Sequence, residues 1–358
     1  MKLSRLPASG LVLPSLVLAL SVTLSACDDQ PAPRAFQRPT PAPAAATAAA
    51  TRGAAIPDHP VVGDIPDTLT LSVPATAPTE QCLLLDAGSA LAPVVLKSTL
   101  VDEFDTLKID DQHWTPHYDG GYDENAHLWL GYNRLSKRSL PTGEEQVYVD
   151  AGFRGTGGVP LGLNPFSIHD GVLGITADRT RPEHRAALGN AAFTSGLLTS
   201  RKFFNQTYGY FELRAQMPAG KALWPAFWLL PTDRSWPPEV DIFEVAGQHA
   251  DIIKFNTHWN DSAGKYTKAP CQVRVEDAAR AFHQYGALWT NEAVTFYVDR
   301  RPVATVKTPA SMHKPMFVLM NLAVGSRGSV GKPDAETPTP SVMLIDHVAA
   351  WALEPARP

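Results

Sequence analysis

The chain has 358 residues, 44% of them hydrophobic, and a formal net charge of −5. This length is enough for one large all-β domain or for two ordinary domains. The mild negative charge, without any run of basic residues, argues against nucleic acid as a partner. The sequence also has no Cys/His cluster of the zinc-binding kind and no glycine-rich loop ahead of a helix, so we expect no catalytic cofactor.

Residues 1–27 have the composition of a targeting segment. Lys2 and Arg5 give a basic start, and the apolar run from about Leu11 to Leu24 is too short to span a bilayer comfortably. Its end, Leu-Ser-Ala-Cys27, resembles the lipobox of bacterial lipoproteins. We therefore expect a signal peptide, lipidation of Cys27 and a membrane anchor in a bacterial cell envelope, on the periplasmic side of the inner or outer membrane. The alternative is an ordinary secretory signal with an incidental cysteine.

Residues 28–95 are rich in Pro, Ala and Thr, as in the segment 41–47. Such a composition buries too little surface to offset the entropy of ordering, so we expect a largely disordered tether. A small separate domain is the alternative, and a short ordered piece from Cys82 to Leu96 is compatible with either. In an oxidising compartment Cys82 and Cys271 could form a disulfide, and two independent thiols are the alternative.

Residues 96–355 are the expected folded domain, which we take to be monomeric. Short β-like runs separated by turn signals fill it, for example Gly171–Ala177, Val294–Asp299 and Pro315–Asn321. Only Val275–Gln284 has a short helical pattern. Many short strands without alternating helices predict an all-β sandwich rather than a parallel α/β fold.

The segment Glu239–Glu244, with the sequence Glu-Val-Asp-Ile-Phe-Glu, places three carboxylates among apolar β-formers. Since alternate residues of a strand face opposite sides, Glu239 and Asp241 share one face. The adjacent apolar residues Ile242 and Phe243 indicate a one-residue β-bulge, which returns Glu244 to that face. Three acids on one face repel one another, so a purely structural role is unfavourable.

This pattern suits the hydrolysis of a glycosidic bond. A retaining mechanism needs two carboxyl groups about 5–5.5 Å apart, one as nucleophile and one as general acid/base. Asp241 would hydrogen-bond Glu239 between them. The charges of Asp241 and Glu239 should raise the pKa of Glu244, so that Glu244 starts protonated.

These residues resemble glycoside hydrolase family 16, whose bulged members carry Glu-x-Asp-x-x-Glu. The resemblance includes Val101–Asp105, Tyr208–Arg214, Met217–Gly220, Leu223–Pro231, Trp236–Glu239, Phe282–Gly286, Asn321–Gly325 and Ile345-Asp346. It implies a concanavalin-like jelly roll of two curved antiparallel sheets with a concave substrate groove. It also implies endo-acting hydrolysis of β-linked glucans or galactans.

By position, the resemblance implies that Glu239 is the nucleophile, Asp241 its helper and Glu244 the general acid/base. The sequences of Asn164–Ser167 and Trp224–Pro231 are most similar to those of bacterial exopolysaccharide depolymerases and 1,3-1,4-β-glucanases. The chain departs from its relatives after Asn-Leu-Ala-Val-Gly325, where they usually carry a tryptophan and this chain has Ser, Arg and Gly. We therefore expect one platform at the groove edge to be missing, which leaves the substrate open.

Aromatic rings that stack on sugars are the next candidates. We expect Trp224 and Trp236 to contact sugar, because each directly precedes a proline near the acidic strand. Trp228 could be either a sugar contact or a core residue, and Trp259 is undecided between the same roles.

Polar candidates for substrate binding are Arg214, His258, Asn133 and Asn321. Arg214 could instead pair with Glu212 on its own strand. His258 matches a family histidine near the cleavage point, and a buried sandwich histidine is the alternative. The resemblance also implies a structural calcium ion, held by the Asp346 side chain, the Gly171 carbonyl and a carbonyl near Glu103.

We therefore expect an exported, retaining endo-β-glycanase that acts on a β-glucan or a bacterial exopolysaccharide. A lectin-like binding module and a transglycosylase are the main alternatives on the same scaffold. A purely structural envelope protein would leave the acidic strand unexplained.

Overall fold

A computed structural model describes residues 65–75, 77–109, 113–118, 138–139 and 143–354, together with the backbone of 34–35, 122–123 and 128–129. All of these residues belong to one compact unit, Ala32–Pro358. Within the described residues, no helix has the length and apolar character needed to cross a membrane. The predicted signal peptide with Cys27, most of the predicted tether, and Asn133 lie outside the described residues.

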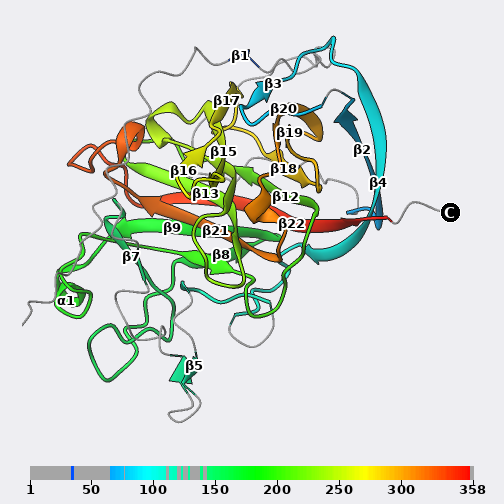
Figure 1. Cartoon of the computed structure of the whole chain (residues 1–358). Coiled ribbons are helices and arrows are strands. Elements are labelled where there is room, and N and C mark those ends of the chain that lie inside the picture. Colours follow the sequence, from blue (N-terminus) through cyan, green and yellow to red (C-terminus); the bar gives the residue numbers. More distant parts are fainter. Residues whose placement is uncertain are drawn as a thin grey trace, which may run out of the picture. The chain divides into compact units, whose positions relative to one another are not determined.

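Two large, mostly antiparallel sheets make up the described part of the unit (Figure 1). The front sheet contains β1 (Arg34–Ala35), β11 (Leu197–Thr199), β13 (Leu223–Pro231), β14 (Glu239–Glu244), β15 (Ile252–Asn260), β16 (Tyr266–Lys268), β17 (Cys271–Arg274) and β21 (Met316–Val324). The back sheet contains β2 (Thr68–Pro74), β3 (Leu83–Leu84), β4 (Leu91–Asp102), β7 (Gln146–Tyr148), β8 (Phe166–His169), β9 (Val172–Arg179), β10 (Phe193–Ser195), β12 (Gly209–Gln216), β18 (His283–Trp289), β19 (Ala293–Val298), β20 (Arg301–Lys307) and β22 (Ser341–Leu353).

The remaining elements are short. They are the hairpin of β5 (Tyr122–Asp123) and β6 (Leu128–Trp129), the helix α1 (Pro182–Arg185), and the 3₁₀ turns η2 (Gly247–His249), η3 (Ala310–Met312) and η4 (Gly328–Val330). The helical pattern of residues 275–284 does not form a helix. Those residues make turns and then enter β18, so that prediction was wrong.

The main core lies between the two sheets. Phe243 of β14 meets Tyr285 of β18 edge to face, with ring centroids 5.1 Å apart, and Phe255 of β15 stacks on Phe296 of β19 at 5.0 Å. Both pairs belong to one large cluster of buried residues to which strands of both sheets contribute. Sheets that pack face to face through alternating inward side chains form a sandwich, so the predicted fold class is confirmed.

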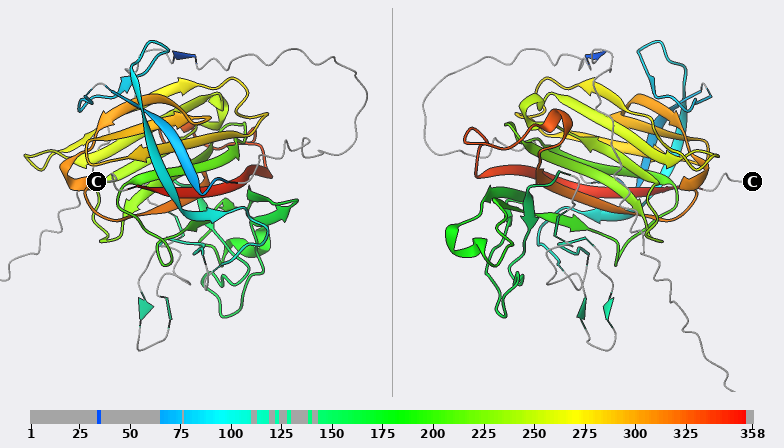
Figure 2. Two further views of the ribbon diagram at one scale, coloured as in Figure 1. Left: turned by 90° about the vertical axis from the view of Figure 1, so that its right-hand side faces the viewer. Right: turned by 60° about the vertical axis from the view of Figure 1, so that its left-hand side comes forward.

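The predicted start of the folded domain at residue 96 was wrong. Strand β2 pairs with β4 along its whole length, from Thr68–Lys97 to Pro74–Leu91. Leu69 and Leu71 then pack on Tyr210 and Trp351, on the face of the back sheet that points away from the main core. Figure 2 (left) shows β2 and β4, blue to cyan, crossing over the other strands. The segment thus covers the back sheet, because its alternating leucines give it one apolar face.

A disulfide joins the segment before β4 to the front sheet. Cys82 and Cys271 are bonded with their Cα atoms 6.0 Å apart, within the usual range for a disulfide. The bond spans 189 residues of sequence. The sequence left open either a disulfide or two independent thiols, and the structure contains the disulfide.

Candidate active site

The three acids of β14 lie on one face of the front sheet, which we call the acid face. Register along β13 passes from Phe227–Phe243 directly to Trp228–Asp241, so Ile242 is the extra residue of a β-bulge. The bulge predicted from the paired apolar residues is confirmed. Val240, Ile242, Phe243 and Val245 are all buried in the core between the sheets. Because these side chains face the core, the side chains of Glu239, Asp241 and Glu244 face the opposite side of the strand.

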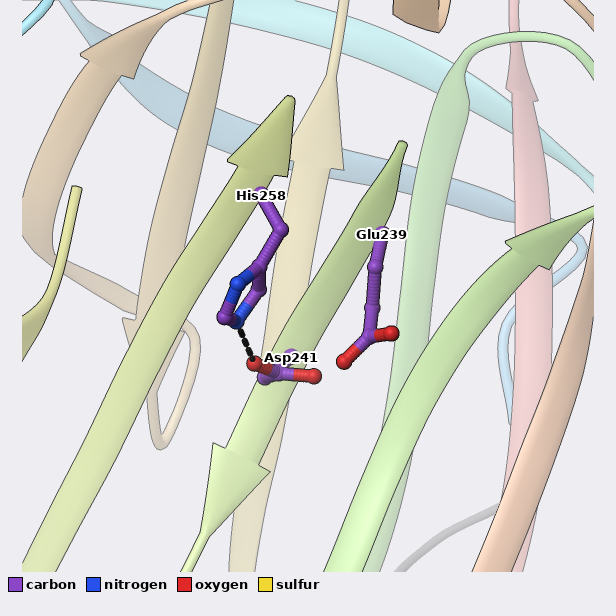
Figure 3. A group of neighbouring side chains, drawn as sticks. All are labelled: Glu239, Asp241 and His258. Atoms are coloured by element: carbon purple, nitrogen blue, oxygen red, sulfur yellow. Dashed lines mark hydrogen bonds and ion pairs between the residues drawn. The ribbon is translucent and has the colours of Figure 1, made fainter. Parts of the chain in front are cut away.

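Glu239, Asp241 and His258 converge from the neighbouring strands β14 and β15 (Figure 3). Their ligand atoms lie within 4.8 Å of one another. The His258 Nε2 atom is 2.9 Å from Asp241 Oδ2, a direct hydrogen bond. That direct bond uses the position that a bridging metal ion would need, so the trio is better described as a hydrogen-bonded group than as a metal site.

Each glutamate of the acid face accepts a hydrogen bond from an indole. Trp236 Nε1 donates to Glu239 Oε2 at 2.6 Å, and Trp224 Nε1 donates to Glu244 Oε1 at 3.0 Å. An indole nitrogen is a donor only, so these bonds favour the ionised carboxylates. The two tryptophans that the sequence placed nearest the acids therefore contact the acids themselves.

Burial raises the pKa of all three acids. The pKa of Glu239 rises to about 8, first because of burial and then because of the Asp241 charge. Burial and the Glu244 charge raise the pKa of Asp241 well above its usual range. The pKa of Glu244 is also raised, chiefly by burial, with the Glu239 charge contributing. The predicted direction for Glu244 is therefore correct, but desolvation is a larger cause than the charges invoked from sequence.

Tyr266 is a member of the site that the sequence did not reveal. Its hydroxyl lies 2.6 Å from His258 Nδ1. Its ring is close to parallel with two others, with centroids 5.6 Å from Trp236 and 5.8 Å from His258. A sequence signal did exist, since Asp261 and Gly264 mark a tight turn that folds β16 back along β15.

A second polar group continues the acid face. Trp228 donates its indole N–H to Asn321 Oδ1 at 2.8 Å, and Asn321 Nδ2 donates to the Tyr148 hydroxyl at 3.0 Å. Tyr148 and Tyr118 both donate to Glu144 Oε1. Trp228 and Asn321 are thus buried on the acid face. Because both side chains are buried and hydrogen-bonded to other residues, they support the acid face from below and offer little surface for a sugar to contact.

Two of the predicted substrate contacts were wrong. Trp259 is buried in the core between the sheets, because it neighbours His258 in β15 and so points to the opposite side. Arg214 lies in β12 of the back sheet, where its guanidinium pairs with Asp346 at 3.2 Å and covers the Phe282 ring. Glu212 is bonded by Arg300 rather than by Arg214.

The residues implied for calcium fit the ion poorly. A Cβ built on Gly171 would lie 3.8 Å from the Glu103 carbonyl oxygen, so these two backbones do approach each other. The only carboxylate of the set, Asp346, is however bonded by His347 Nδ1 at 2.8 Å and paired with Arg214. Cationic and N–H partners already compensate its charge, which disfavours a divalent cation beside it.

Basic side chains border the acid face. Lys254 and Lys268 of β15 and β16 lie opposite Glu244 and His258 in the strand register. Arg327 follows β21 in the segment that departs from the family pattern, and its charge lowers the pKa of both Asp241 and His258. A cation thus lies near the site in the segment that follows β21.

Residues 165–342 match the family model of glycosyl hydrolases family 16. The chain is 40% identical over 260 residues to the endo-1,3-1,4-beta-glycanase ExsH of Rhizobium meliloti, which covers 73% of this chain and 52% of ExsH. It is 39% identical to EglC of the same organism, also named an endo-1,3-1,4-beta-glycanase, over 74% of this chain and 54% of EglC. The chain therefore spans about half the length of these two relatives.

Two further comparisons concern the fold and a binding protein. The structure matches the laminarinase catalytic domain of Thermotoga maritima with a TM-score of 0.55 at 24% identity, over 73% of this chain and 99% of that one. This match shows the jelly-roll fold. A beta-1,3-glucan-binding protein of Penaeus monodon is 32% identical over 123 residues, or 30% of this chain and 33% of that protein.

Proposed function

This chain belongs to glycoside hydrolase family 16, and we propose that it is an endo-β-glycanase that hydrolyses internal β-glycosidic bonds with retention of configuration. The observation that carries the proposal is the pair Glu239 and Glu244, placed on one face by the bulge and each bonded by an indole N–H. The relatives named endo-1,3-1,4-beta-glycanases support a β-glucan or a related exopolysaccharide as substrate.

The proposed roles follow from the order of the two glutamates in the motif, because their surroundings are alike: each is buried, accepts an indole N–H and lies near His258. Glu239 attacks the anomeric carbon in its ionised form, which the Trp236 bond and the nearby His258 favour, although burial keeps the pKa of Glu239 at about 8. Glu244 keeps a proton through its raised pKa, gives it to the departing glycosidic oxygen, and later takes one from water. Asp241, held by His258, lies beside Glu239 and raises its pKa when charged.

Activity on a panel of β-1,3-glucan, mixed-linkage β-glucan and bacterial exopolysaccharide tests the function. The matched blanks are Glu239→Ala and Glu244→Ala, which should lose about 10⁴-fold or more of kcat while binding the polymer normally. Azide and an aryl β-glycoside then separate the two roles. In Glu239→Ala, azide displaces the phenolate directly and gives the α-glycosyl azide. In Glu244→Ala, it attacks the glycosyl-enzyme and gives the β-glycosyl azide, so the opposite pattern would reverse our assignment.

We also propose export and lipid anchoring through Cys27, which rest on the lipobox-like sequence alone. Labelling of the whole protein with a radioactive fatty acid in cells tests this, with Cys27→Ala as the matched control. Label that persists in the variant would contradict an anchor at Cys27.

A glycan-binding module is the second candidate, and the similarity to a beta-1,3-glucan-binding protein favours keeping it. This candidate predicts polymer binding without release of reducing ends by the wild type. A transglycosylase would instead release products that are longer than the substrate. Analysis of product length from a defined oligosaccharide distinguishes both from the hydrolase.

A further inference from the structure

Tyr266 contacts two residues of the candidate active site, Trp236 and His258. It comes from β16, the short strand that pairs only with β15 among the described strands. Its ring is close to parallel with the Trp236 ring, at a centroid distance of 5.6 Å, and with the His258 ring, at 5.8 Å. Its hydroxyl is at hydrogen-bond distance from His258 Nδ1. A single side chain therefore contacts both the residue bonded to Glu239 and the residue bonded to Asp241.

We propose that Tyr266 is a positioning residue of the proposed glycanase, which fixes the tautomer of His258 so that an N–H faces Asp241. A neutral imidazole has one donor nitrogen and one acceptor nitrogen. With the Tyr266 hydroxyl donating to Nδ1, the proton of the ring resides on Nε2. The Nε2–H then donates to Asp241 Oδ2 across the observed 2.9 Å.

The surroundings of His258 support the neutral form. Burial lowers its pKa, although Glu239 and Glu244 raise it, and Lys268 and Arg327 lower it further. An imidazolium would donate from both nitrogens. The neutral ring keeps its proton on Nε2, where it faces the acceptor-only Asp241 carboxylate, and a hydroxyl that donates to Nδ1 adds to this preference. If the proton moved to Nδ1, the Nε2 lone pair would face the Asp241 carboxylate and repel its charged form. A Tyr266 hydroxyl that donates to Nδ1 disfavours that arrangement.

Tyr266→Phe tests the hydroxyl alone, because the phenyl ring can keep both stacking contacts. We expect kcat to fall about tenfold with KM changed less than about twofold, as for one lost hydrogen bond in a buried charged network. Tyr266→Ala removes the ring as well, so KM should also rise several-fold as Trp236 loses its support. Tyr208→Phe is the matched control: it removes a 2.8 Å Tyr–His hydrogen bond to His313, away from the acid face, and should leave both constants unchanged.

Nitrogen-15 NMR of the His258 side chain gives a readout that does not depend on activity. The wild type should show the neutral ring with its proton on Nε2, and Tyr266→Phe should weaken this preference, since only the Asp241 bond remains to favour it. A wild-type ring protonated on Nδ1, or an unchanged tautomer and kcat in Tyr266→Phe, would overturn the proposal. This role of Tyr266 rests on the proposed function, but the experiments let the role and the function fail separately. A wild type inactive on every glycan refutes the glycanase, while the NMR result still decides the tautomer.

Discussion

Trp236 donates its indole N–H to Glu239 at 2.6 Å, although half of the Trp236 surface is exposed. The same side chain therefore presents a flat ring to solvent and bonds the proposed nucleophile. Rings of this kind bind sugars through their faces, while an N–H beside a carboxylate favours its ionised form. Substrate binding and the protonation state of Glu239 are thus linked through one residue.

Trp236→Phe should separate these two functions. The ring remains, but the N–H that lowers the pKa of Glu239 is lost, so that pKa rises above about 8. We expect kcat/KM at pH 7 to fall about tenfold and the acid limb of the pH profile to move to higher pH. Trp224→Phe is the contrasting control: it should raise the pKa of Glu244 and move the basic limb instead. An acid limb that stays in place in Trp236→Phe would contradict the link.

Glu239→Gln should stabilise the protein above neutral pH. The pKa of Glu239 is about 8 in the folded protein against an ordinary value of 4.5. The folded state therefore binds more protons than the unfolded state between these values, and wild-type stability falls as the pH rises through this window. We expect the variant to gain about 4 kcal/mol at pH 8 and little at pH 4. Urea unfolding at both pH values measures this, with Glu183→Gln, an exposed residue of α1, as control. Equal gains at the two pH values would refute the shifted pKa.

Arg327→Gln tests the cation in the segment that departs from the family pattern. Removing its charge should raise the pKa of Asp241 and His258 together, because Arg327 lowers both. Activity should then begin at higher pH, with kcat/KM reduced about two- to fivefold on the acid side at low salt. Arg301→Gln, an exposed residue of β20 in the back sheet, should change neither quantity. Matching pH profiles for wild type and Arg327→Gln would show that the charge does not act on the acids.

Loss of the disulfide should affect stability without affecting catalysis. The bond closes a loop of 189 residues and lies away from the acid face. We expect Cys82→Ser to lower the free energy of unfolding by about 2–5 kcal/mol while kcat stays within twofold. Unfolding of oxidised wild type, reduced wild type and Cys82→Ser in urea provides the comparison. If all three unfold alike, the disulfide contributes nothing in solution.

The sequence predicted the sandwich and the acidic strand because both depend on local patterns. Alternation requires one apolar side, and the adjacent Ile242 and Phe243 leave a bulge as the way to return Glu244 to the acid face. The same parity argument would have placed Trp259 in the core, because His258 beside it faces the acids. Judging each tryptophan only by its distance in sequence from the acids does not show which face of the strand it occupies.

Other features depend on which strands become neighbours, which local patterns do not show. Arg214 and Glu212 alternate with apolar residues in sequence, but only the sheet order places them in the back sheet. Tyr266 reaches His258 because a hairpin returns the chain to it. The alternation of Thr68–Pro74 was present in the sequence, but the surrounding Pro/Ala/Thr composition concealed it.

The most direct test of the account is the configuration of the first product. Proton NMR during hydrolysis of a short β-glucan oligosaccharide by the wild type shows which anomer forms before mutarotation, with Glu239→Ala as the blank. Double displacement through Glu239 predicts the β-anomer first and no product from the variant. The α-anomer first, or unchanged product from Glu239→Ala, would contradict a retaining mechanism at this site.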